Sequence, residues 1–309
     1  GRSVIITSAL EETSARGGKA EVLTYSTAQD RRAIATDLLR GFRRIGINGP
    51  GIVHTNYLEV QRLAPSAELV DVGEGLEAAR MIKDREEVGR IRKACRIASR
   101  VADEIPGMLR RGMKEYEAAA ELDYRMMRMG ASGAAFGTNA SFGASSAEPH
   151  HGAEDIALRE GDTALFDFGC KVEGYCSDIT RTFFLGEPED WQRRMYQVVA
   201  EAQRAALGTI RAGANGRDVD AAARAVIDAS EFKGLMVHST GHGLGLSVHD
   251  GGRMAPNHDL PLRPGMVLTV EPGVYVRGKG GVRIEDDVLI TEEGYEMLTD
   301  ADRTMRAIP

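Results

Sequence analysis

The sequence predicts an α/β protein with two domains, the larger of which is built from two similar halves. Three observations support this prediction. The 309 residues are enough for two hydrophobic cores. Segments with helical apolar spacing alternate with short apolar runs that are typical of strands. After a join at 72–84 the pattern changes from residue 85, and the order helix, helix, glycine-rich loop, strands then occurs twice. We therefore expect a small N-terminal α/β domain at 1–78 and a larger domain at 79–309.

The first domain is predicted to contain three short strands and one long helix. The letters SVIIT, AEVLTYS and AELVDVG indicate strands at 3–7, 20–26 and 67–73. A helix is predicted over 27–46, with Ile34, Leu38 and Phe42 on its apolar face. The letters GINGPGIV then supply turn residues. These elements predict a small α/β unit.

The larger domain is predicted to begin with two helices, at 85–105 and 113–130. The apolar face of the first helix contains Val88, Ile91, Cys95, Ala98, Val101 and Ile105. A loop rich in Gly, Ser and Ala leads to strands at 163–185. Helices at 191–213 and 218–230, a second glycine-rich loop and further strands repeat this order.

Two segments repeat in their letters as well as in their order. LREGDTALFDFG aligns with LRPGMVLTVEPG, and each has an acid six residues after its first glycine, Asp167 and Glu271 respectively. A second acid follows in each half: Asp178 lies eleven residues after Asp167, and Glu285 lies fourteen after Glu271. This repeat predicts a pseudo-twofold domain whose site lies between the halves.

The four acids lie in or beside strands that are otherwise apolar. A buried carboxylate costs several kcal/mol unless it is paired or bound to a cation. One such acid is explained by a turn or an arginine partner, whereas two in each half favour a cation site. With His242, which lies among glycines, the set suits a pair of divalent cations, because two +2 charges offset four carboxylates. Ligands rich in oxygen favour Mn, Co, Fe or Zn.

The remaining histidines differ in what their positions predict. The letters HSTGHGLGLSVHD place His238 and His249 on either side of His242, so loop geometry can bring both near the metals. His249, followed by Asp250, suits a general acid or base or a donor to an oxyanion. We expect the histidines without such spacing to be solvated, namely His54, His151 and His258.

Composition narrows the classes of partner and compartment. The net charge is −7, and acidic and basic residues are interspersed, so we expect no nucleic-acid partner. No apolar run approaches the roughly 18 residues of a membrane helix, and we expect no membrane span. Three cysteines without a CxxC pair predict reduced thiols and a cytoplasmic location. Cys170 and Cys176 are expected to be packing residues.

At this point the chain resembles a known family. The segments HSTGHGLGLSVHD, VEPGVY, GVRIEDDVLIT and FDFGCKVEGYCSDITRTF are similar to those of the M24 metallopeptidases, the creatinase/aminopeptidase group with the pita-bread fold. The resemblance covers about residues 80 to 309. The first domain resembles only the later part of the family's N-terminal domain, so we expect it to be short or incomplete.

The resemblance implies a role for each candidate ligand. Asp167 would bind one metal, His242 and Glu271 the other, and Asp178 and Glu285 would bridge the two. Mn or Co is expected ahead of Zn or Fe. The resemblance also implies that a hydroxide bridging the metals attacks the peptide carbonyl.

Further roles carry over to residues around the metals. Glu271 would be the general base, and His150 and His249 would stabilise the tetrahedral intermediate or handle the leaving nitrogen. His238 would shape the substrate pocket, and Arg283 would position the substrate. Arg253 matches more loosely an arginine that grips a proline carboxylate, and it is equally compatible with a solvated loop arginine.

Within the family, the short spacing from Glu271 to Glu285 resembles that of prolidases and Xaa-Pro aminopeptidases. The expected activity is therefore hydrolysis of Xaa-Pro bonds in proline-containing peptides, with an Xaa-Pro dipeptidase (prolidase) expected first. The alternative is an Xaa-Pro aminopeptidase acting on longer peptides. Non-catalytic pita-bread proteins and creatinase usually lack ligands that this chain retains. Relatives also suggest a homodimer.

Overall fold

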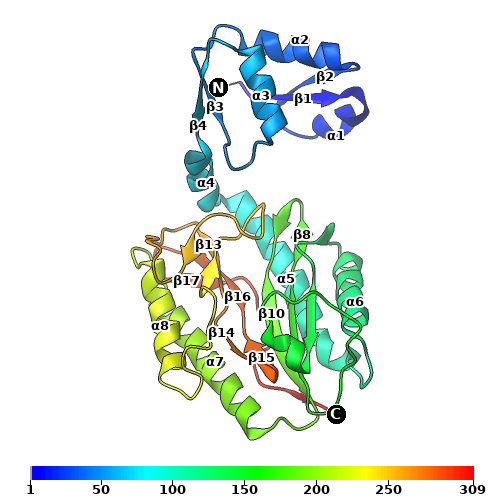
Figure 1. The fold of residues 1–309 in the computed structure, drawn as a ribbon, viewed down its shortest axis with the longest axis vertical. Helices are drawn as coiled ribbons and strands as arrows, with labels where there is room; N and C mark the ends of the chain where they lie inside the picture. The colour runs from blue at the N-terminus through cyan, green and yellow to red at the C-terminus, as the bar shows by residue number, and fades with distance from the viewer. Residues whose placement is uncertain (1) are drawn as a thin grey trace. The chain divides into compact units, whose positions relative to one another are not determined.

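The computed structural model describes residues 2–309, and the chain forms two compact units. The first unit ends at Glu77, and the second runs from Ala78 to Pro309. The division falls within helix α4 (Gly73–Met81). Figure 1 shows the helices and strands of each unit.

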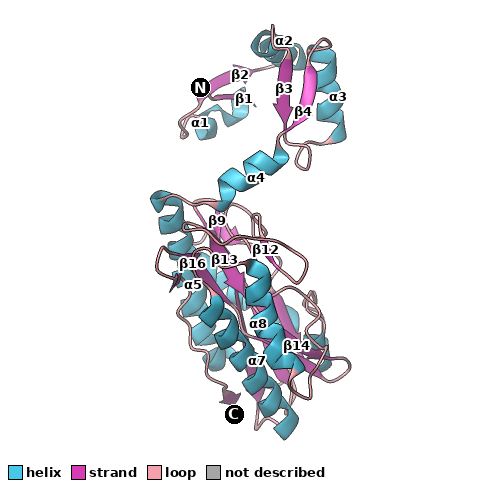
Figure 2. Cartoon of the chain, turned by 90° about the vertical axis from the view of Figure 1, so that its left-hand side faces the viewer, coloured by secondary structure: helices cyan, strands magenta, loops and turns pink. Residues whose placement is uncertain are grey.

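The first unit contains two pairs of parallel strands. β1 (Val4–Ser8) pairs with β2 (Glu21–Tyr25), and β3 (Arg44–Ile47) pairs with β4 (Glu68–Asp71). Figure 2 shows β3 and β4 side by side. The helices of this unit are the short η1 (Ala9–Glu11), α1 (Glu12–Ala15), α2 (Ala28–Leu39) and α3 (His54–Leu63). All three strands predicted from the sequence are present within a residue or two.

The long helix predicted over 27–46 is wrong in its second half. Helix α2 ends at Leu39, and Gly41 follows with a φ of +84°, which favours glycine and breaks the helix. The next residues form strand β3, and Phe42 is 59% exposed instead of packing on a helix face. Helix α3 was not predicted from the sequence.

The first half of the second unit packs two helices against an antiparallel sheet. α5 (Arg85–Met108) begins with a capping box, in which Asp84 accepts from the Glu87 amide and Glu87 from the Asp84 amide. α6 (Glu115–Arg128) is the second helix. Their apolar faces cover β6 (Asn139–Phe142), β7 (Thr163–Phe168) and β10 (Ile179–Leu185). The pattern of 85–105 predicted this face correctly, since Ile91, Cys95 and Ile105 are fully buried.

The second half repeats this arrangement with its own core. α7 (Asp190–Thr209) and α8 (Gly216–Asp228) pack on β13 (Val267–Val270), β14 (Gly273–Val276), β15 (Gly280–Arg283) and β16 (Asp286–Ile290). In Figure 1, α8 lies at the left edge of this unit and α6 at the right edge. The remaining elements are β5 (Gly133–Ala134), η2 (Gly143–Ala147), β8 (Cys170–Val172), β9 (Tyr175–Cys176), β11 (Gly241–His242), β12 (Arg253–Met254), β17 (Tyr295–Met297) and β18 (Ala307–Ile308).

Strand register brings the predicted acids toward one place. β10 pairs with β7 so that Thr180 lies opposite Asp167. β13 pairs with β16, which starts directly after Glu285, and Glu271 directly follows β13. Asp178 directly precedes β10. Each half therefore presents its two acids at strand ends, as the repeat in the sequence predicted.

Two of the glycines around His242 are required by close backbone contacts. A Cβ atom at Gly241 would lie 1.9 Å from the carbonyl oxygen of Thr269, and one at Gly243 would lie 1.7 Å from that of Gly251. No side chain fits at either position without moving the backbone. The glycines therefore allow the short strand β11, which carries His242, to lie directly against its neighbours.

Within residues 2–309, no helix has the length and apolar character that crossing a membrane requires. Cys95, Cys170 and Cys176 are all buried, and none of them forms a disulfide within the described chain. Cys170 and Cys176 belong to hydrophobic clusters, which confirms their prediction as packing residues.

Candidate metal and catalytic site

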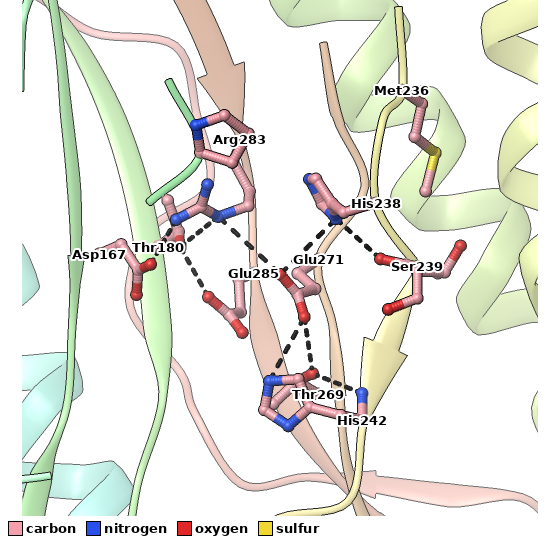
Figure 3. Close-up of polar contacts among 12 residues, drawn as sticks. Asp167, Thr180, Met236, His238, Ser239, His242, Thr269, Glu271, Arg283 and Glu285 are labelled. Carbon is pink, nitrogen blue, oxygen red and sulfur yellow. Dashed lines mark hydrogen bonds and ion pairs between the residues drawn. The ribbon is translucent and has the colours of Figure 1, made fainter. Parts of the chain in front are cut away.

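All five predicted metal ligands line one cavity of about 660 Å³ in the second unit. They come from β7, from the turn before β10, from β11, and from the segments that follow β13 and β15. The five residues are Asp167, Asp178, His242, Glu271 and Glu285. Figure 3 shows four of them converging from these elements.

Three of the five residues form a tight cluster. Asp178, His242 and Glu285 each offer a ligand atom, and these atoms lie within 4.8 Å of one another. All three residues are buried. The His242 Nε2 atom lies 3.7 Å from an Asp178 oxygen and 3.4 Å from Oε1 of Glu271, which extends the cluster to a fourth residue.

Arg283 lies between the two remaining acids. Its Nη2 atom donates to Asp167, and its Nε atom lies 4.0 Å from Oε2 of Glu271. The Nε atom also donates to the Thr180 hydroxyl, 2.9 Å away, and that hydroxyl donates to Glu285 at 2.6 Å. These contacts are visible in Figure 3. Arg283 therefore contacts, directly or through Thr180, three of the four carboxylates.

Burial and the excess of negative charge raise the pKa of three of these acids. Burial raises the pKa of Asp178, and the negative charges of Glu285 and Asp167 raise it further. Burial and Glu271 raise the pKa of Glu285 in the same way, and burial raises the pKa of Glu271. Within residues 2–309, the buried Oδ1 atoms of Asp167 and Asp178 have no hydrogen-bond partner.

This donor set fits divalent cations. Orphaned buried carboxylate oxygens are costly, and a cation both satisfies them and offsets the repulsion between the acids. Four carboxylates with one imidazole are ligands that first-row divalent metals accept. The arrangement of the five predicted ligands in the structure therefore fits divalent cations.

The other predicted histidines also reach the cavity. His150, His238 and His249 all line it. The rings of His249 and His242 lie 4.2 Å apart between centroids. Burial lowers the pKa of His249, and the neighbouring His242 lowers it further. Burial also lowers the pKa of His238, so both side chains are neutral at pH 7.

Arg253 lines the same cavity from strand β12, where it pairs in register with His242. Its side chain is exposed, and it has no carboxylate partner within 4.0 Å among residues 2–309. The guanidinium group is therefore available to an anionic group in the cavity.

The prediction that His151 is solvated is wrong. Its side chain is 7% exposed, and its Nε2 atom lies 2.8 Å from Oε2 of the fully buried Glu115. Glu115 lies 36 residues earlier in the chain, so only the tertiary structure reveals the pair. His54 and His258 are exposed, as predicted.

Several side chains that support the site were not identified from the sequence. Tyr275 accepts a hydrogen bond from Arg283 at 2.8 Å and lies 2.7 Å from His238 Nε2. Asp287 accepts from the Asp178 amide at 3.0 Å and from the Cys95 thiol. The available signals were the tyrosine of VEPGVY, four residues after Glu271, and the second aspartate of IEDD, two residues after Glu285.

Comparison with known proteins agrees with this geometry. The sequence profile of metallopeptidase family M24 matches residues 89–292. The Xaa-Pro dipeptidase of Pyrococcus furiosus is 36% identical over 272 residues, which cover 87% of this chain and 77% of that protein. The chain therefore belongs to metallopeptidase family M24, as the resemblance in its motifs predicted.

Two solved structures extend the likeness to the whole chain. The X-Pro aminopeptidase from Thermotoga maritima has a TM-score of 0.91 and 34% identity, covering 99% of this chain and 87% of that one. The Xaa-Pro dipeptidase from Bacillus anthracis has a TM-score of 0.93 and 33% identity, covering 99% and 86%. The predicted pita-bread fold, preceded by a small N-terminal domain, is confirmed. The chain is a metallopeptidase of the hydrolase class.

Proposed function

We propose that this protein is an exopeptidase that hydrolyses Xaa-Pro bonds with two divalent cations, and that it is an Xaa-Pro dipeptidase. The observation that carries the proposal is the convergence of four carboxylates and one imidazole on a single cavity, in which Arg283 pairs with Asp167. Relatives named for both dipeptidase and aminopeptidase activity support the choice of bond.

The assignment of ligands follows the sequence prediction. Asp167 would hold one cation, His242 and Glu271 the other, and Asp178 and Glu285 would contact both. The orphaned oxygens of Asp167 and Asp178 support their part in this set. Such cations supply Lewis acidity and a water that ionises near neutral pH.

The chain's own residues supply the proton transfers. Glu271 takes a proton from the attacking water, and its raised pKa brings it closer to the operating pH, where a general base is most effective. His249 is neutral at pH 7 and donates its N–H to the carbonyl oxygen as negative charge develops there. The proline nitrogen has no hydrogen and must gain a proton when the bond breaks. His150, which lines the cavity, would assist this step.

Substrate selection rests on the cavity and on Arg253. A cavity of about 660 Å³ is in the range of small-molecule sites and accommodates a short peptide. The free guanidinium of Arg253 would bind the carboxylate of a dipeptide through a charge-assisted contact. His238 would border the substrate, and Arg283 would position the substrate relative to the four acids. The alternative is an Xaa-Pro aminopeptidase whose groove admits longer peptides.

One measurement separates these functions. Protein stripped with EDTA and refilled with Mn or Co is given Ala-Pro and Ala-Pro-Ala side by side, and released amino acids are quantified. Release from Ala-Pro alone is expected for the dipeptidase. Release of alanine from Ala-Pro-Ala would instead establish the aminopeptidase. If no amino acid were released from either peptide, the proposal would be overturned and a non-catalytic role for the fold would be favoured. The identity of the metal, a homodimer and a cytoplasmic location stay predictions.

A further inference from the structure

Glu115 is a fully buried carboxylate outside the set of candidate ligands. It is the first residue of helix α6, and its side chain has no exposed surface. Its Oε1 atom accepts from the Phe142 amide at 2.8 Å and from the Ser145 hydroxyl. Its Oε2 atom accepts from the Glu154 amide at 2.9 Å and contacts the His151 ring at 2.8 Å. Both oxygens therefore have two polar partners.

These partners lie at the two ends of one loop, residues 143–154, which we call the His150 loop. Phe142 directly precedes it, Ser145 is near its start, and His151 and Glu154 are near its end. His150 lies between the two anchored ends and lines the catalytic cavity. One carboxylate thus holds both ends of a segment that carries a candidate catalytic side chain, and one of its anchors, His151, directly follows His150.

The other half of the domain holds its histidines in a related way. On α8, the fully buried Asp220 accepts from the amide and the hydroxyl of Thr240. Its ion-pair partner Arg224 donates to the carbonyl oxygens of Met236 and His238. In each half, a buried acid on the second helix fixes the backbone beside a histidine of the cavity.

We propose that Glu115 is a positioning residue that fixes His150 in the cavity through His151 and the ends of the His150 loop. A carboxylate is required because it can accept from all four donors, whereas a glutamine amide places N–H groups against the Glu154 amide. Loss of these anchors frees the loop, and a displacement of about 1 Å at a catalytic group lowers the rate by up to roughly 100-fold. The kinetic part of this inference rests on the proposed Xaa-Pro hydrolysis.

The first test does not depend on activity. Amide hydrogen exchange is measured by mass spectrometry for the wild type, Glu115→Gln and Glu121→Gln. Glu121 is the matched control, because it lies on the same helix and pairs with Arg125 at the surface. Exchange in peptides spanning 142–154 is expected to be roughly tenfold faster or more in Glu115→Gln alone. Unchanged exchange in this loop would overturn the anchoring role.

The second test asks whether Glu115 acts through His150. Hydrolysis of Ala-Pro is compared in Glu115→Gln, His150→Ala and the double variant, with metal content measured for each. We expect kcat to fall about tenfold or more in Glu115→Gln while metal content is unchanged. In the His150→Ala background the further loss is expected to be less than about threefold. A full additional loss in that background, or a wild-type kcat in Glu115→Gln, would overturn the proposal.

A milder variant guards against a general folding defect. His151→Ala removes only one of the four contacts, and it is expected to shift loop exchange and kcat in the same direction by a smaller factor. If the wild type itself does not cleave Xaa-Pro peptides, the proposed function fails. The exchange experiment still decides whether Glu115 holds the His150 loop.

Discussion

The hydroxyl oxygen of Tyr275 lies 2.7 Å from Nε2 of His238, and this contact fixes which nitrogen of the imidazole carries the proton. Arg283 donates to the same oxygen, and because a guanidinium only donates, the hydroxyl hydrogen is left for His238. His238 Nδ1 lies 2.8 Å from the carbonyl oxygen of Ser239 and must donate to it. His238 is therefore neutral with its proton on Nδ1.

Replacing Tyr275 tests this chain of contacts. Tyr275→Phe leaves a buried donor on Arg283 and the Nε2 lone pair of His238 without partners, which costs about 1–3 kcal/mol. We expect kcat/KM for Ala-Pro to fall roughly tenfold, since about 1.4 kcal/mol corresponds to that factor. Metal content should not change. A variant with wild-type kcat/KM would show that the orientation of His238 does not matter for the reaction.

Removing one candidate bridging acid is expected to change activity and stability in opposite directions. Asp178→Asn removes a negative charge from a buried acidic cluster, in which burial and Glu285 already raise the pKa of Asp178. The metal-free variant should therefore unfold at a higher temperature, by about 2–4 °C for each kcal/mol gained. Metal content should fall, and activity should drop by roughly 10³-fold or more.

The matched control for this substitution is Asp218→Asn, at an exposed position on α8. It should leave metal content, activity and unfolding temperature unchanged. If Asp178→Asn kept both metals and full activity, the ligand assignment would be wrong.

Arg253 is expected to govern binding of dipeptides. Arg253→Met removes a charge-assisted contact worth about 1.5–3 kcal/mol, so KM for Ala-Pro should rise roughly 10- to 100-fold. The value of kcat should change much less, because the substitution leaves the acids and histidines in place. Arg277→Met, at an exposed arginine outside the residues lining the cavity, is the control. An unchanged KM for Ala-Pro would assign Arg253 to the solvated surface.

Arg181 is a buried arginine that holds the backbone of the candidate ligand Glu285. It is 2% exposed and donates to the Glu285 carbonyl at 2.7 Å and to the buried Asp286 at 2.8 Å. Arg181→Met should lower the free energy of unfolding by about 3–5 kcal/mol, because it leaves a buried charge short of a partner. Arg303 pairs with the same carboxylate from a half-exposed position, and Arg303→Met should cost only about 1 kcal/mol. Equal losses in urea unfolding would contradict this account.

Lys83 predicts a dependence of stability on pH. It is buried beside Asp250 and Arg80, and burial lowers the pKa of its ammonium group to about 8. The unfolded chain, with a pKa near 10.5, then binds more protons than the folded one between about pH 8 and 10.5, so stability rises with pH across this window. The negative charge of Asp250 opposes this lowering of the Lys83 pKa.

The measurement compares the wild type with Lys83→Met in urea at pH 7.5 and 9.5. Relative to the variant, the wild type should gain about 2 kcal/mol over this interval. The difference between the two proteins isolates Lys83 from other groups that titrate in the same range. A constant difference would show that Lys83 is not desolvated in the folded protein.

The sequence alone predicted the features that depend on local pattern and residue type. Apolar spacing identified α5 and its buried face, and the repeated acids located both halves of the domain. Acids in apolar strands pointed to a cation site, because such residues are costly to bury without a counter-charge. The order of Asp167, Asp178, His242, Glu271 and Glu285 was also sufficient to predict the family.

The tertiary structure decided what depends on contacts between distant residues. Whether His151 is solvated depended on Glu115, and the proton position on His238 depended on Tyr275 and Arg283. Local pattern also gave a wrong prediction for the residues after Gly41. The positive φ of Gly41 ends helix α2, and the following residues pair with β4 as strand β3. Hydrogen-bond partners and burial are set by packing across the fold, and no spacing along the chain encodes them.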